Sequence, residues 1–178
     1  ARLYFDIAVW RRGPQDVPAG PLLLPATALA YGAIAVLSSM AASTMLPASA
    51  RASRGMGLLI VAADILFVLL WYWVVLQIAA RRERFTQTAT ALFGAATVLT
   101  LPSVLTVQLV FWSMSGSGKW LAPFALVAAI AVLVWSVLAA AHILRHALEQ
   151  PLRWCVPLVV LQLFVEQLLA LALVPLAR

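Results

Sequence analysis

Two carboxylates lie deep inside long apolar stretches of this sequence, and they are the residues best suited to chemistry. Asp64 and Glu166 are the only acids well inside predicted membrane-spanning segments. A charged carboxylate at the bilayer centre costs about 2.5–3.5 kcal/mol on insertion scales, so such residues default to a functional hypothesis. At 1.5 Å per residue, Asp64 lies about 12 Å and Glu166 about 16 Å from the outer end of its segment. The two side chains could therefore meet and share one proton.

Two glutamines could extend this polar group. Gln162 precedes Glu166 by one helical turn, and Gln108 lies in the third apolar segment. Three interpretations of the acids stay open. They are neutral groups that hold helices together through hydrogen bonds, parts of a proton or cation pathway, or contacts with a partner subunit or polar ligand.

His142 and His146 are four residues apart and so share one face of a helix. This spacing can hold a metal when further ligands exist, and Glu149 is the nearest candidate. The pattern favours interfacial histidines beside Arg145, near anionic lipid head groups. A bis-histidine haem needs ligands on opposite sides of the iron, which one short helical stretch cannot supply. We expect no metal or other cofactor.

No pattern typical of an enzyme stands out in the chain. Nucleophile elbows, phosphate-binding glycine loops and intramembrane protease motifs are absent from the sequence, and Ser115-Gly116-Ser117-Gly118 is typical of a flexible turn. The predicted loops are too short to form an active site outside the membrane. The sequence predicts a non-enzymatic protein.

Composition places the chain in a membrane. Hydrophobic residues make up 65% of it and charged residues 10%, with a mean hydropathy of +1.02, whereas soluble domains are about 45–50% apolar. The long apolar runs predict an all-α polytopic protein and not a β-barrel, whose strands alternate in polarity. The basic residues lie at the ends of apolar runs, which argues against nucleic acid as a partner. Cys155 is the single cysteine, so no disulfide forms within the chain.

Hydropathy divides the chain into a short N-terminal segment and one transmembrane domain. Residues 1–20 predict an interfacial amphipathic helix over 1–12, with Leu3, Ile7 and Trp10 on one stripe, followed by a proline-rich elbow. Residues 21–178 form the transmembrane domain. Its five predicted spans cover about 22–46, 56–80, 85–114, 120–144 and 154–176.

Pro102 lies near the middle of the third span. Proline has no N–H, so the carbonyl of Val98 loses its usual partner and the helix is expected to kink. Thr100, Ser103 and Thr106 are close enough in sequence to bond freed backbone groups. The kink is either simple architecture or part of a hinge or binding cavity.

The basic loop Arg81-Arg82-Glu83-Arg84 sets the expected orientation. Cationic loops beside membrane spans stay in the cytoplasm, so the N-terminus is expected there and the C-terminus outside. Eleven Arg against one Lys indicates a GC-rich bacterial genome and thus a bacterial inner membrane, with the C-terminus in the periplasm. The residues expected at the lipid interface are Trp10, Arg81, Arg82, Arg84, His142, Arg145 and His146.

Several short motifs resemble the Yip family, a five-span membrane domain first known from Rab-interacting proteins and also found in bacteria. They are Phe85-Thr86-Gln87-Thr88 leading to Gly94, Pro102-Ser103, and Trp135-Ser136 followed by Ala139-Ala140-Ala141. The resemblance covers residues 14–176. It implies a non-enzymatic protein, with a cytoplasmic N-terminus, that organises partners or membrane shape. The acidic and tyrosine-containing features of the eukaryotic members are not evident, so Rab binding is not implied.

Together these patterns predict a membrane scaffold or accessory subunit that binds other membrane proteins or lipids. Its expected partners are the lipid bilayer and other membrane subunits. A first alternative is a proton-coupled or small-solute translocator that uses Asp64 and Glu166. A second is an accessory subunit of a redox or light-driven complex, in which Trp71, Trp73 and Trp135 contact a cofactor held by a partner.

Overall fold

Helices provide all the regular structure in the part of the chain that the computed structural model describes, residues 2–18, 20–43, 54–114 and 118–173. The helices are α1 (Arg2–Ala8), α2 (Leu23–Ser43), α3 (Arg54–Ile78), α4 (Phe85–Met114), α5 (Ala122–Leu148) and α6 (Leu152–Leu173), with 3-10 turns η1 (Pro14–Asp16), η3 (Arg82–Arg84) and η4 (Lys119–Leu121). The five helices from α2 to α6 are long and apolar enough to cross a membrane. The predicted all-α class with five spans is confirmed.

The helix bounds differ from the predicted spans at several ends. The third span matches α4, whereas α3 begins and ends two residues earlier than expected, α5 continues to Leu148, and α6 begins at Leu152. The observed ends of α3 and α5 have a common cause, because Ala80 (φ 55°) and Glu149 (φ 56°) take the left-handed conformation that closes a helix. Hydropathy carries no signal for such a cap. The predicted ends at 44–46 and 174–176, and Arg51 and Arg178, lie outside the described residues.

The N-terminal helix is shorter than the predicted 1–12. It ends at Ala8 because Trp10 takes a left-handed φ of 62°, and the Arg11 N–H then donates to the Asp6 carbonyl at 2.8 Å. Its environment also differs from that of a helix lying on lipid alone. Ile7 and Ala8 are fully buried against protein, while Phe5 is exposed.

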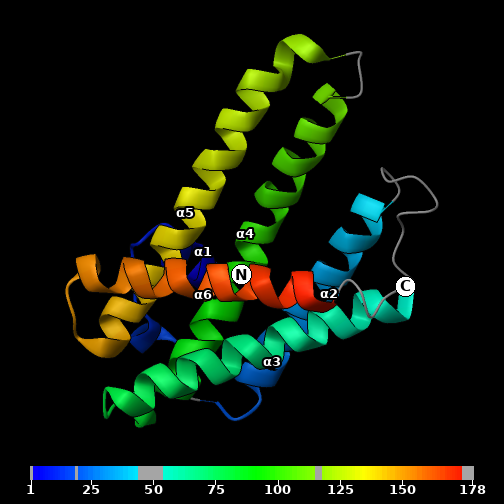
Figure 1. Ribbon diagram of the computed structural model, residues 1–178. Coiled ribbons are helices and arrows are strands. Elements are labelled where there is room, and N and C mark those ends of the chain that lie inside the picture. The colour runs from blue at the N-terminus through cyan, green and yellow to red at the C-terminus, as the bar shows by residue number, and fades with distance from the viewer. Residues whose placement is uncertain (1, 19, 44–53, 115–117, 174–178) are drawn as a thin grey trace.

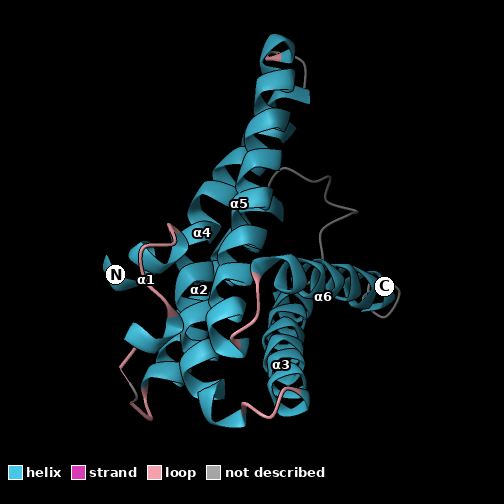
Figure 2. Cartoon of the chain, turned by 90° about the vertical axis from the view of Figure 1, so that its left-hand side faces the viewer, coloured by secondary structure: helices cyan, strands magenta, loops and turns pink. Residues whose placement is uncertain are grey.

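An antiparallel hairpin of α4 and α5 organises the fold. The two helices lie side by side and extend beyond all the other labelled helices in both views (Figures 1 and 2), while α3 and α6 run across the hairpin. We call residues 85–99 and 135–148 the hairpin base, and residues 100–114 and 119–134 the hairpin arm. With 30 residues, α4 is about 45 Å long, more than the roughly 30 Å of a hydrocarbon core.

Small residues let the other helices approach the hairpin base closely. Gly94 lies against the Tyr4 ring of α1, so close that a Cβ atom at this position would overlap the ring. In the base, Ala89, Ala91, Ala95, Ala139, Ala141 and Ala147 are buried. The main apolar core forms there, where α1, the C-terminal half of α3 and the N-terminal half of α6 pack on the hairpin.

α4 is a single helix across Pro102. The hydroxyl groups of Thr100, Ser103 and Thr106 donate to the carbonyls of Ala96, Leu99 and Pro102, at 2.8, 2.7 and 3.0 Å. These hydroxyl groups bond carbonyls of their own helix, but none of them bonds the Val98 carbonyl, which is the group that Pro102 was expected to free. The kink itself stays a prediction.

Candidate functional site: a cavity between the five long helices

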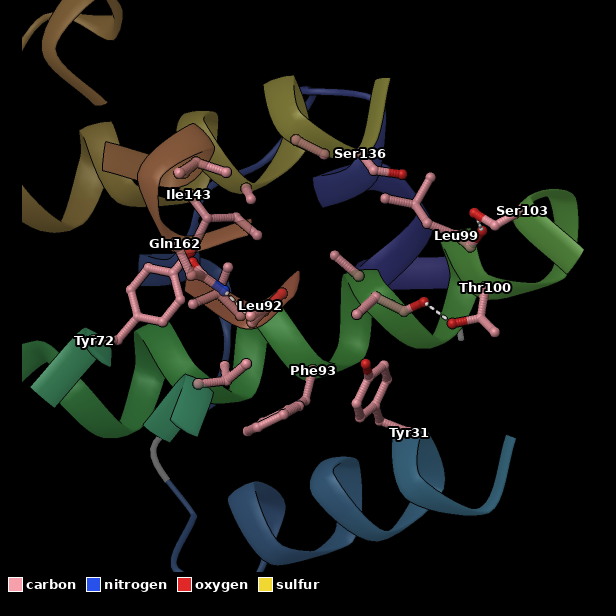
Figure 3. A pocket seen from close by; sticks show the side chains of 17 residues that line it. Tyr31, Tyr72, Leu92, Phe93, Leu99, Thr100, Ser103, Ser136, Ile143 and Gln162 are labelled. Carbon is pink, nitrogen blue, oxygen red and sulfur yellow. Dashed lines mark hydrogen bonds between the residues drawn. The ribbon is translucent and has the colours of Figure 1, made fainter. Parts of the chain in front are cut away.

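A cavity of about 250 Å³ lies where α2 to α6 meet beside the hairpin base (Figure 3). Its wall is mostly apolar and includes three aromatic rings and several polar groups. The polar and aromatic residues that line it are Tyr31, Tyr72, Phe93, Thr100, Ser103, Ser136, Gln162 and Glu166. For comparison, an apolar cavity of about 150 Å³ accommodates benzene, so this one has room for a somewhat larger molecule.

The structure gives the two intramembrane acids different partners. The Tyr31 hydroxyl donates to Asp64 Oδ2 at 2.9 Å, and Gln162 Nε2 donates to Glu166 Oε1 at 2.8 Å. The carboxylates are near enough to interact electrostatically. Glu166 lines the cavity itself, whereas Asp64 lies behind Tyr31. The two acids lie in one region of the protein, as their predicted depths suggested. Each accepts its hydrogen bond from another residue, and the acids do not bond each other.

Gln162 has one unpartnered polar atom. Its side chain is only 7% exposed, and among the described residues its Oε1 has no hydrogen-bond donor. A buried acceptor without a donor costs about 1–3 kcal/mol. Figure 3 shows Gln162 at one end of the cavity beside Tyr72. The unsatisfied acceptor lies next to the Glu166 carboxyl group, and surrounding protein atoms enclose it.

Most of the hydroxyl groups around the cavity already donate elsewhere. Thr100, Ser103 and Ser136 each donate to the carbonyl four residues earlier in their own helix, at 2.8, 2.7 and 2.9 Å. The Tyr31 hydroxyl donates to Asp64. Four of the five hydroxyl groups in the wall thus have their protons engaged, which leaves the wall richer in acceptors than in donors.

Sequence reasoning identified part of this site and missed the rest. It singled out Asp64, Glu166 and Gln162, but not Tyr31 or Tyr72. A tyrosine within an apolar span could have signalled a polar contact, since its hydroxyl needs a partner when buried. Gln108 does not join the group, because it lies half-buried on the hairpin arm and is not part of the cavity wall.

A second polar cluster lies at the end of the hairpin base. Arg81 and Arg84 both pair with Glu149, and Arg84 Nη1 also donates to the His146 carbonyl at 3.1 Å. The hydrogen bond from Arg84 and the charge of Arg81 hold the pKa of Glu149 below its usual range. These contacts join the loop after α3 to the end of α5, so the cluster closes the base.

The two histidines pack on each other within this cluster. The His142 and His146 rings form an edge contact with centroids 4.7 Å apart, and His142 Nε2 lies 3.2 Å from the Arg12 carbonyl oxygen. Glu149, the third ligand considered for a metal, is turned toward the two arginines. Within the described ranges, no three His, Cys, Asp or Glu side chains gather as a metal site would require.

The other residues predicted at the lipid interface show graded exposure. Trp10, Arg82 and Arg145 are exposed, while Arg81 and Arg84 are half-buried through their ion pairs.

The tryptophans considered for cofactor contact differ in their exposure and hydrogen bonding. Trp135 Nε1 donates to the Ala8 carbonyl at 2.8 Å, Trp73 is exposed, and the buried Trp71 Nε1 has no acceptor in the described part of the chain.

No family model, curated protein or solved structure gives a significant match to this chain.

Proposed function

We propose that this protein is a non-enzymatic membrane scaffold or accessory subunit whose hairpin arm binds the helices of another membrane protein. The observation that supports this proposal is the apolar surface of the arm. Within the described residues of the hairpin, every exposed large apolar side chain lies in the arm, among them Leu101 at 66%, Trp120 at 72% and Phe124 at 69% exposure. The base fixes the hairpin and leaves the arm uncovered on its outer faces.

Gln108 supports a protein partner in addition to lipid. It carries an amide group on the half-buried surface of the arm, and lipid hydrocarbon offers an amide no hydrogen bond. Amide side chains join neighbouring transmembrane helices through such bonds. A partner helix that supplies a polar group at this depth would satisfy Gln108.

The proposal includes the bacterial inner membrane and the orientation predicted from charge. The resemblance to the Yip family agrees with such a role and stays part of the proposal, without Rab binding. Reporter fusions test the orientation: alkaline phosphatase active at the C-terminus and a fluorescent protein bright at the N-terminus are expected. The reverse pattern would contradict it.

Photo-crosslinking in the native membrane tests the scaffold function. A photoreactive residue replaces Leu105 or Phe124 of the arm in turn, and as a matched control Leu66 of α3 or Leu171 of α6, each 66% exposed. Mass spectrometry should find one recurring membrane protein attached to the arm positions and only lipid at the controls. Lipid adducts alone at all four positions would refute the proposal.

The convergence of the two acids favours a second candidate, a proton-coupled or small-solute translocator. The observation behind it is that Asp64, through Tyr31, and Glu166 both reach the cavity. In liposomes, a flux lost in Asp64→Asn and Glu166→Gln variants that still fold would support it. Unchanged flux in both variants would remove this candidate.

A further inference from the structure

The cavity between the long helices has the chemistry of a ligand site, independently of the arm. It is lined mainly by apolar side chains and has a few polar groups, which is the usual composition of a small-molecule pocket. Gln162 and Glu166 lie together at one end, and Thr100, Ser103 and Ser136 lie toward the other (Figure 3). Glu166 brings a carboxyl group into this mostly apolar wall, and its one described hydrogen bond runs from Gln162 Nε2 to Oε1 at 2.8 Å. Its second oxygen, Oε2, is left to accept a hydrogen bond from a bound group.

The polar groups select a donor over an acceptor. An ionised Glu166 carboxylate accepts hydrogen bonds and cannot donate them, while four of the five wall hydroxyls already donate elsewhere. A ligand carboxylate or phosphate would meet like charge. A ligand N–H group would donate to Glu166 in a charge-assisted hydrogen bond.

The aromatic rings further favour a cation. Tyr31, Tyr72 and Phe93 line the cavity, and the Tyr31 and Phe93 rings lie 5.5 Å apart. Ring faces attract ammonium groups, most strongly away from water. Ammonium binding beside Glu166 would also compensate the carboxylate for its removal from water.

We infer that the cavity binds a compact organic ammonium cation, with its nitrogen donating to the Glu166 carboxylate and its apolar body against the aromatic rings. This inference goes beyond the scaffold function, because the arm and the cavity use different residues. It names a ligand class and not a transport step. The volume of about 250 Å³ suits an aryl or branched alkyl amine and excludes a whole lipid.

Fluorine NMR with a fluorinated phenethylammonium probe tests the inference. The full chain is placed in lipid nanodiscs, and empty nanodiscs of the same lipid measure partitioning of the probe into the bilayer. Saturable binding above the empty nanodiscs is expected, with the ammonium at least about tenfold tighter than the matching alcohol, a difference of roughly 1.4 kcal/mol. The matching carboxylate should not bind. Equal binding of ammonium and alcohol, or no saturable binding, would overturn the inference without any variant.

Three variants locate the bound probe. Glu166→Gln should weaken ammonium binding about tenfold or more, and so should Gln162→Leu, which removes the N–H that orients Glu166. Gln108→Leu removes an amide outside the cavity wall and should change binding less than about twofold. Gel filtration checks that each variant is folded. Unchanged binding in folded Glu166→Gln would overturn the site. Proton flux that depends on Glu166 without ammonium binding would overturn it too, and would leave the translocator candidate standing.

Discussion

The hairpin base and the hairpin arm belong to the same two helices, yet they meet opposite surroundings. In the base, residues 88–95 are all buried, and small residues bring α1 and the other helices close. In the arm, Ser113 and Ala125 are the buried residues of the described part, and large apolar side chains point outward. The difference shows that apolar character alone does not mark a protein core in a membrane, because lipid accepts the same side chains.

Close packing should make the base far more sensitive than the arm to cavities. Leu144→Ala in the base, where Leu144 is fully buried, should destabilise the fold by about 2–5 kcal/mol, since the hole left behind fills poorly. Leu105→Ala in the arm should cost less than about 0.5 kcal/mol, because lipid refills the space. Thermal unfolding in the same detergent compares the two. Equal losses would mean that the arm is packed as tightly as the base.

Gly94→Ala sharpens the comparison at one contact. The new methyl group would overlap the Tyr4 ring, which lies directly against Gly94, so α1 must shift at a cost of about 1–3 kcal/mol. Limited proteolysis of the N-terminal segment should show α1 released. Adding Tyr4→Ala should restore much of the protection, because the clash is then removed. If the double variant is no better than Gly94→Ala alone, the Tyr4 contact is not what the glycine serves.

Trp135→Phe tests the hydrogen bond that joins α1 to α5 where the base meets the arm. The indole N–H donates to the Ala8 carbonyl at 2.8 Å, and its loss should cost about 1 kcal/mol. Amide exchange in α1 should speed up while exchange in the arm is unchanged. The matched control is Trp120→Phe on the arm, at 72% exposure, for which no such change is expected in α1.

The smallest effect concerns pH at the closed end of the base. The pKa of Glu149 lies below its usual value of 4.5, so its pairing with Arg84 and Arg81 stabilises the fold above that pH and is lost as the pH falls through the lower, folded value. Unfolding at a series of pH values should therefore show acid destabilisation that is reduced in Glu149→Gln. Glu83→Gln, in the same loop but exposed, should leave the acid slope unchanged. High salt should weaken the effect.

Hydropathy was enough to place the five long helices but not their partners. Arg84 and Glu149 are 65 residues apart, and no local pattern links them. Similarly, Gly94 entered the sequence analysis only through the family resemblance, and its role as a packing surface depends on α1, which the sequence assigned to the lipid interface. Helix caps at Ala80 and Glu149 were missed because both lack the glycine that usually marks a left-handed residue.

The membrane class, the number of long helices and the expected depths of Asp64 and Glu166 follow from the sequence alone, since each depends on local hydropathy and on the fixed rise of a helix. Contacts between helices set which faces pack on protein, make Tyr31 and Gln162 the partners of the two acids, and form the cavity beside them. An α-helix that is apolar all round can turn any face inward, so only the contacts between helices select the one that lines a site.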